Sequence, residues 1–380
     1  MQIGSNVVNW NRLAHTSMSL ILLMLLLTTS TGTFAQLVVD PNADYTHGIA
    51  LYAQGHYDQA LLAFAQSIAA TPANADAYAY RGLCYGKLNQ MELSKPDFSK
   101  AIALDAQNVM AHYGLGIYYC MSGKMEDGIP ELSIAIARKP DFAEAYYYRG
   151  NAYKHSANLA LAIEDYSKAI ALKPDYISAY SYRGSAYHEN GKLDLALADY
   201  NKVLELHPND ATTYDNRAIV YTDGGKLDLA LADLNKALTL QPDYADAYIN
   251  RGVVYADSGN PALALADFTT AITLKPQGNP AAYYSRGCLY SDKQQQQLAI
   301  ADYTKAIALK PDFSDAYFNR GLSYRQSGML ELAIADYSKA LALKPDDATT
   351  YYNRSICYKA LGKQELAEQD LAKAHALGHP

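Results

Sequence analysis

The chain has 380 residues, of which 19% are charged, and it carries a formal net charge of −7. An acidic surface disfavours nucleic acid and anionic membranes, so we expect neither as a partner. The sequence holds no glycine-rich phosphate loop and no GxSxG or HExxH motif. It therefore predicts no catalytic site, no cofactor and no small-molecule substrate.

The N-terminal residues have the pattern of an export signal. Arg12 is followed by the apolar stretch 18–27, which is too short to span a bilayer because a span takes about twenty residues. Ala35 offers the small residue that precedes a signal-peptidase cut. We predict a signal peptide over 1–35, a leader over 36–40 and, once the signal is cleaved, no transmembrane helix. The protein is then exported, to the periplasm or the extracellular space; the alternative is an uncleaved anchor.

From residue 41 to residue 380 the sequence repeats with a period of 34 residues. Numbered within a unit, most units have Tyr at place 4, Gly at place 8, Tyr at place 11, Ala at places 20 and 27, and Pro at place 32. One unit, which starts at Ala245, is 35 residues long, and its extra residue falls in the turn before the next unit. The ten units start near Pro41, Ala75, Val109, Ala143, Ile177, Ala211, Ala245, Pro280, Ser314 and Ala348.

Each unit has two stretches with helical spacing of apolar and small residues, separated by a turn. In the seventh unit the first stretch includes Tyr248, Gly252 and Tyr255, and the second covers residues 263–274. One such hairpin cannot bury its apolar face alone, whereas ten stacked hairpins form a continuous core. Pro ends the second helix, and we expect the Asp that follows it to cap the next helix. These residues are Asp141, Asp175, Asp243, Asp312 and Asp346.

The spacing of these residues resembles that of the tetratricopeptide repeat. The resemblance covers residues 41–380. It implies an all-α fold, an α-solenoid of ten helix-turn-helix units that forms a right-handed superhelix. It also implies a groove, lined by the first helices, that binds extended peptides or partner segments.

Eight units carry Arg at place 7 and Asp sixteen residues later. We predict a salt bridge between the two helices of each unit, because the planar guanidinium can bind a carboxylate through two nitrogens. A basic stripe for nucleic acid is disfavoured, since each Arg has its own partner. The pairs are Arg81–Asp97, Arg149–Asp165, Arg183–Asp199, Arg217–Asp233, Arg251–Asp267, Arg286–Asp302, Arg320–Asp336 and Arg354–Asp370.

Place 6 differs between the two halves of the array: it is mostly Tyr in the first half and mostly Asn in the second. The repeated Asn resembles the asparagine ladder of tetratricopeptide superhelices, whose amides hold a peptide main chain. An amide both donates and accepts hydrogen bonds, so it can pair with any backbone. The alternative is that Asn is only tolerated on this surface; in either case we expect place 6 to lie outside the packing. The four residues are Asn216, Asn250, Asn319 and Asn353.

Two further sets of residues are expected to face the groove. Acidic residues in the second half favour an extended, basic protein or peptide as the partner. Tyrosines in the first half form an aromatic wall typical of binding hot spots, with packing between units as the alternative. The acidic residues are Asp223, Asp257 and Asp292, and the tyrosines are Tyr147, Tyr148 and Tyr182.

No Cys/His spacing in the sequence is typical of a zinc site. The cysteines are interpreted as small buried thiols, and only Cys84 and Cys120 lie in adjacent units, where a disulfide is conceivable. His155 and His188 occupy neighbouring places on adjacent first helices, beside Glu189. We interpret them as exposed polar residues, with a metal or pH-sensing patch as the alternative.

The sequence therefore predicts a non-enzymatic, exported scaffold for protein–protein interaction. Two alternatives stay open: an assembly factor or chaperone for envelope proteins, and an accessory subunit of an envelope enzyme complex. In the last unit Glu368 and His375 stand where other units have aliphatic residues. A polar outer face of this kind is expected of a terminal repeat.

Overall fold

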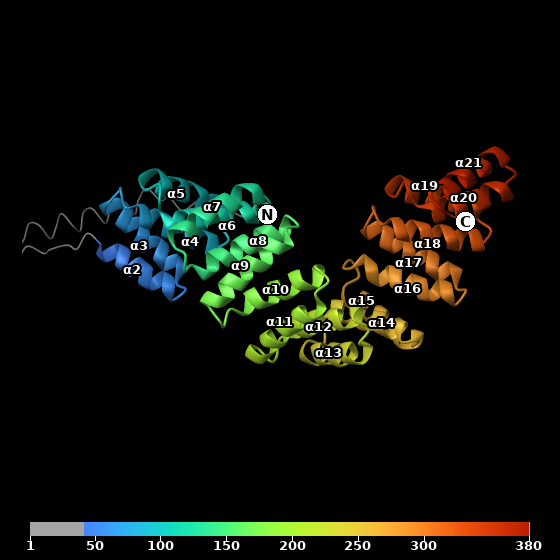
Figure 1. The fold of residues 1–380 in the computed structure, drawn as a ribbon, viewed down its shortest axis with the longest axis horizontal. Coiled ribbons are helices and arrows are strands. Elements are labelled where there is room, and N and C mark those ends of the chain that lie inside the picture. The colour runs from blue at the N-terminus through green and yellow to red at the C-terminus, as the bar shows by residue number, and fades with distance from the viewer. Residues whose placement is uncertain (1–41, 380) are drawn as a thin grey trace, which may run out of the picture.

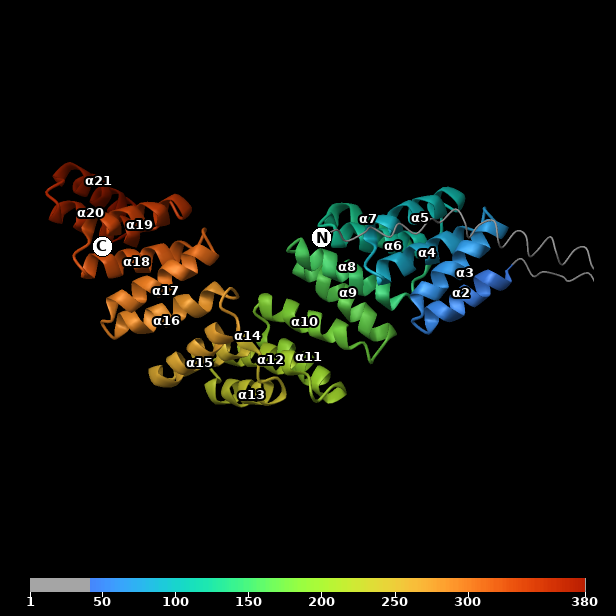
Figure 2. The ribbon, with the colours of Figure 1, turned by 180° about the vertical axis from the view of Figure 1, so that it is seen from behind.

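The protein is all-α over residues 42–379, which are the residues that the computed structural model describes. Twenty helices pack pairwise in tandem, so the predicted α-solenoid fold is confirmed. The array bends into an open arc whose middle is formed by α11 to α15 (Figure 1), and the view from behind shows the same bend (Figure 2). The first helices are α2 (Ala43–Ala53), α4 (Ala75–Lys87), α6 (Val109–Met121), α8 (Ala143–His155), α10 (Ile177–Glu189), α12 (Ala211–Asp223), α14 (Ala245–Asp257), α16 (Pro280–Asp292), α18 (Ser314–Gln326) and α20 (Ala348–Ala360). The second helices are α3 (Tyr57–Ala70), α5 (Met91–Leu104), α7 (Met125–Arg138), α9 (Leu159–Leu172), α11 (Leu193–Leu206), α13 (Leu227–Leu240), α15 (Pro261–Leu274), α17 (Gln296–Leu309), α19 (Leu330–Leu343) and α21 (Gln364–Ala376).

The turn inside every hairpin contains one residue in the left-handed region. Seven of these residues are glycines with φ between +69° and +80°, which costs them no strain because they have no Cβ. The other three are Asn89, Ala157 and Gln294, with φ of +59°, +57° and +60°. Ala157 and Gln294 therefore hold a backbone conformation that disfavours their side chains.

The expectation that Asp141 and its equivalents cap the first helices is wrong. The N-cap lies one residue later, and in four units it is an aromatic residue without a side-chain cap: Phe142, Tyr176, Tyr244 and Phe313. Three of these rings pack on place 5 of the preceding unit, with centroids 4.6 to 5.1 Å from the partner ring. The N-cap position therefore serves the contact between units.

Small residues let the two helices of a hairpin approach each other. A Cβ placed on Gly252 would lie 2.7 Å from the ring of Phe268, so only glycine fits opposite this ring. The sixth unit has the smaller Leu234 at place 24 and tolerates Ala218 at place 8; both are buried. In the sixth unit a smaller partner at place 24 thus leaves room for a methyl group at place 8.

The eight predicted Arg–Asp salt bridges are confirmed, with closest N–O distances of 2.7 to 2.8 Å. In the seventh unit Arg251 donates from Nε and Nη2 to the two carboxylate oxygens of Asp267, and from Nη1 to Oδ1 of Asn235 in the preceding unit. The guanidinium also lies over the rings of Tyr248 and Tyr255. Each such Arg, except Arg81, makes this third bond, so the residue joins units as well as helices.

The third unit replaces the Arg–Asp pair with a different one. Leu115 stands at place 7, and Nδ1 of His112 lies 2.5 Å from a carboxylate oxygen of Glu131. The other ring nitrogen of His112 lies 3.2 Å from the carbonyl oxygen of Ala106. The carboxylate at place 23 thus keeps a partner although the Arg is missing.

Several predictions concern the ends of the chain. The predicted signal peptide and leader lie outside the described residues. Between residues 42 and 379, no helix is both long and apolar enough to cross a bilayer. Glu368 and His375 are exposed, so the last described hairpin does present a polar face.

Candidate functional site

The first helices form the inner face of the arc. Each contacts the first helix of the next unit, whereas within residues 42–379 no second helix contacts the second helix of the next unit. The first helices therefore lie closer together, which places them on the concave side. This face, from α2 to α20, is the groove in which the candidate residues lie.

Successive first helices meet at a spacing of 35 residues, one more than the period. The residue at place 6 contacts the residue at place 5 of the preceding unit. The pairs are Tyr113–Tyr148, Tyr147–Tyr182, Asp215–Asn250 and Tyr284–Asn319. Place 6 is thus a contact between units, in both halves of the array.

The four asparagines of the predicted ladder do not share one environment. Nδ2 of Asn250 donates to Asp215 over 2.8 Å, and Nδ2 of Asn319 donates to the hydroxyl of Tyr284 over 2.9 Å. Asn353 is 8% exposed and donates to the carbonyl oxygen of its own helix at Thr349. The expectation that place 6 lies outside the packing is therefore wrong for these three.

Asn216 is the exception among the four. It is half-buried, and its side chain makes no hydrogen bond within the described part of the chain. Its amide is therefore free to donate and to accept. In the other three, the Oδ1 atom accepts no hydrogen bond within residues 42–379, so only the acceptor side of these amides is open.

The three candidate acids also differ. Asp223 accepts from Nε2 of His188 over 2.6 Å, which joins α12 to α10. Asp257 and Asp292 are exposed, end α14 and α16, and have no basic partner among residues 42–379. Two neighbouring units therefore present uncompensated negative charge.

The histidine patch is arranged differently from the interpretation based on the sequence. His188 pairs with Asp223, and Glu189 pairs with Lys154 over 2.6 Å. Both contacts join place 12 of one unit to place 13 of the next. No group of three His, Cys, Asp or Glu side chains in the described range is placed to hold a metal ion.

The tyrosines of the first half pack against one another along the inner face. Tyr147 contacts four rings, among them Tyr148 at 5.2 Å and Tyr182 at 5.6 Å between centroids. Tyr182 is 42% exposed, whereas Tyr147 and Tyr148 are half-buried. Packing between units thus occupies much of these rings, and Tyr182 presents the most surface to a partner.

Comparison with known proteins assigns the family. Profiles described as TPR repeat match residues 158–191, 218–259, 288–328 and 321–362. Profiles described as tetratricopeptide repeat match residues 45–108, 177–210 and 245–277. Together these matches span more than half of the chain. The chain belongs to the tetratricopeptide repeat family.

One solved structure agrees with this assignment of the fold, and two others are similar to part of the chain. A tetratricopeptide repeat protein from Parabacteroides merdae is 18% identical, with a TM-score of 0.55 over 66% of this chain and 98% of that chain. YrrB, described as a TPR protein with an unusual peptide-binding site, is 24% identical, with a TM-score of 0.43 over 50% of this chain and 97% of that one. PilF of Pseudomonas aeruginosa is 18% identical, with a TM-score of 0.48 over 55% and 94%. No curated protein sequence matches the chain.

One acidic residue of this tetratricopeptide repeat groove is buried. Asp215, at place 5 of the sixth unit, is 4% exposed and has no cationic partner among residues 42–379. It accepts hydrogen bonds from Asn250 and from the hydroxyl of Tyr244, 3.3 Å away. Burial raises the pKa of Asp215 above its usual value. The spacing of 35 residues between partners was the signal that could have revealed this contact.

The four cysteines of the tetratricopeptide repeat array are free thiols. Cys84 and Cys357 are buried, as interpreted from the sequence, whereas Cys120 and Cys288 are half-buried. Burial raises the pKa of Cys84 to about 12, so its thiol stays protonated. A thiol in this state is a poor nucleophile.

Proposed function

We propose that this tetratricopeptide repeat protein is a non-enzymatic scaffold that binds an extended, basic segment of a partner protein along its groove. The observation that carries the proposal is the pair of exposed carboxylates, Asp257 and Asp292, one unit apart and without basic partners. Unpaired charges attract a ligand of opposite sign and select against one of the same sign.

The asparagines supply contacts that do not depend on the partner's sequence. Their free Oδ1 atoms can accept hydrogen bonds from main-chain N–H groups of an extended peptide. Asn216, whose amide has no partner within the described residues, can also donate. Specificity for basic side chains would then come from the acids, and affinity for the backbone from the amides.

The charge component is tested with the double variant Asp257→Asn and Asp292→Asn. The probe is a fluorescent, blocked peptide with four lysines in Gly-Ser flanks, titrated at two salt concentrations. We expect binding to weaken about tenfold at low salt and its salt dependence to flatten. The matched control is Asp194→Asn with Asp228→Asn, which removes two exposed charges from second helices. Equal losses in both double variants would contradict a specific acidic site.

The amide component is tested with Asn216→Ala against Asn250→Ala. Loss of a hydrogen bond costs about 1 kcal/mol, so each variant should weaken the peptide about fivefold. Only Asn250→Ala should also lower the melting temperature, because it removes the bond to Asp215. Unchanged binding in both variants would place the backbone contacts elsewhere.

We also propose that the protein is exported, on the basis of Arg12 and the apolar stretch 18–27. Mass spectrometry of the mature N-terminus tests this: a start at Gln36 is expected, and a start at residue 1 or 2 would contradict it. Affinity capture from envelope extract then separates the roles. Many unfolded clients would indicate a chaperone or assembly factor, one stoichiometric enzyme would indicate an accessory subunit, and one structural partner would indicate a scaffold.

A further inference from the structure

The third unit leaves a gap on the inner face. Its residue at place 6 is Gly114, where the neighbouring units have Tyr80 and Tyr148. A Cβ on Gly114 would lie 2.3 Å from the ring of Phe98, so the backbone of α6 rests directly on this ring. As a result α6 packs against α4 more closely than any other two successive first helices do.

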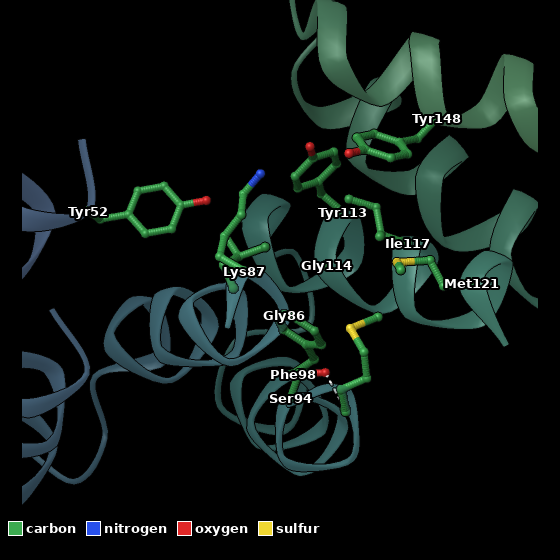
Figure 3. Close-up of a pocket in the computed structure, with 12 residues that line it drawn as sticks. Tyr52, Gly86, Lys87, Ser94, Phe98, Tyr113, Gly114, Ile117, Met121 and Tyr148 are labelled. Carbon is green, nitrogen blue, oxygen red and sulfur yellow. Dashed lines mark hydrogen bonds between the residues drawn. The ribbon is translucent and has the colours of Figure 1, made fainter. Parts of the chain in front are cut away.

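The gap opens into a cavity of about 100 Å³. Its lining comes from the first helices of four consecutive units and from α5 (Figure 3). The apolar part includes Leu83, Met91, Phe98, Ile117 and Met121. For comparison, a dry cavity of about 150 Å³ binds benzene. The size and lining therefore suit one aliphatic side chain, and the lining adapts because methionine is flexible.

The rim of this cavity carries three phenol hydroxyls, each able to donate a hydrogen bond, and one positive charge. Figure 3 shows the hydroxyls of Tyr52, Tyr113 and Tyr148 on the same side of the cavity as the ammonium group of Lys87. None of these four groups has a hydrogen bond or an ion pair within residues 42–379. Lys87 is exposed and is the only charged residue of the lining.

These hydroxyls act as donors at every physiological pH. Burial raises the pKa of Tyr52, Tyr113 and Tyr148, so the three phenols stay protonated. A carboxylate accepts hydrogen bonds from hydroxyls and from an ammonium group at once, and its charge is opposite to that of Lys87. The rim therefore complements an acidic group placed beside an apolar one.

We propose that this cavity binds an aliphatic side chain of a partner segment, with a neighbouring Asp or Glu side chain of the same segment held by Lys87 and the tyrosine hydroxyls. This proposal rests on the proposed function and deepens it. The groove binds basic residues of the partner at its C-terminal half, and the cavity adds a site at the other end for an aliphatic residue beside an acidic one, which we call the anchor. The segment is internal to the partner, since the groove continues from this cavity along α8 and α10.

The experiment uses the full chain with ¹³C-methyl methionine, because Met91 and Met121 line the cavity. Met125 and Met329 lie outside it and serve as internal controls. The probe is a blocked peptide with a Glu-Leu-Glu core in Gly-Ser flanks, compared with Gln-Leu-Gln and Glu-Ser-Glu cores. We expect the first to bind at least fivefold tighter than the others and to shift the methyl signals of Met91 and Met121 alone.

Variants separate the parts of the anchor. Lys87→Glu should reduce affinity for the Glu-Leu-Glu peptide about tenfold, whereas Lys100→Glu, an exposed lysine on α5, makes the same change in net charge and should not. Tyr52→Phe with Tyr148→Phe keeps the rings and should weaken the peptide about threefold.

Three results would overturn the proposal: equal affinity for the three peptides, no shift at Met91 and Met121, or equal effects of Lys87→Glu and Lys100→Glu. A fourth peptide that ends in a free Leu carboxylate tests the other source of the acid, and tighter binding of that peptide would also overturn it. If the four-lysine peptide still binds through Asp257 and Asp292 in these cases, the proposed function stands and only the proposal for the cavity is wrong. If the Glu-Leu-Glu peptide binds in the cavity and the four-lysine peptide does not bind, the proposal that the partner segment is basic is wrong.

Discussion

Removing one partner of an Arg–Asp pair should cost more stability than removing both. In Arg251→Leu the carboxylate of Asp267, 6% exposed, loses two hydrogen bonds of 2.7 and 2.9 Å and becomes an unpaired buried charge. Breaking a buried pair in this way costs about 3 kcal/mol. In the double variant with Asp267→Leu no charge is stranded, so we expect a loss of about 1 kcal/mol. That loss includes the bond from Arg251 to Asn235.

The assay is urea unfolding followed by circular dichroism, combined with hydrogen exchange of the amides in α14 and α15. Exchange is needed because a repeat array can open locally without unfolding as a whole. A double-mutant cycle, completed with Asp267→Leu alone, should give a coupling energy of at least about 2 kcal/mol. Additive losses would refute the reasoning, since they would mean that the two side chains do not stabilise each other.

The third unit supplies the matched control for this cycle. There the carboxylate of Glu131 is held by His112, and Leu115 replaces the Arg. The seventh unit can be given the same arrangement with Tyr248→His, Arg251→Leu and Asp267→Glu together. We expect this triple variant to recover most of the stability that Arg251→Leu loses.

Three further predictions concern single contacts. Gly252→Ala should cost about 2 kcal/mol in unfolding free energy, because its Cβ would overlap the ring of Phe268, and adding Phe268→Leu should restore most of it, as in the sixth unit. Ala157→Gly should raise stability by about 1 kcal/mol, because φ is +57° there, whereas Ala256→Gly within α14 should lower it by about as much. The third prediction concerns Asp215, because burial raises its pKa in the folded protein above the value of 3.8 expected in the unfolded chain. Asp215 therefore favours folding most in acid, and this contribution is lost as the pH rises from the unfolded pKa to the folded pKa. Asp215→Asn should therefore gain melting temperature relative to the parent between pH 4 and pH 7, and parallel pH curves would contradict the assignment.

Contacts within a unit could be predicted from the sequence, and contacts between units could not. Arg251 and Asp267 recur at a fixed separation in one hairpin, so their pairing follows from the packing of two helices. The bond from Asn250 to Asp215 spans 35 residues, and its existence depends on how one hairpin is inclined against the next. The period of 34 residues does not determine that inclination. The single Gly114 at place 6 was visible in the sequence, but the cavity it opens depends on the approach of α4 and α6.

The two halves of the groove differ in the side chains that meet between place 5 of one unit and place 6 of the next. In the first half a ring at place 5, such as Tyr147, packs against a ring at place 6 of the next unit, Tyr182. In the second half Asp215 and Asn250 meet there through a hydrogen bond. The first face buries apolar surface and offers few polar atoms, while the second leaves amide oxygens and carboxylates open to a ligand. An extended partner with an aliphatic–acidic end and a basic end would therefore match this groove in one orientation only, because reversing it would place like charges together at Asp257.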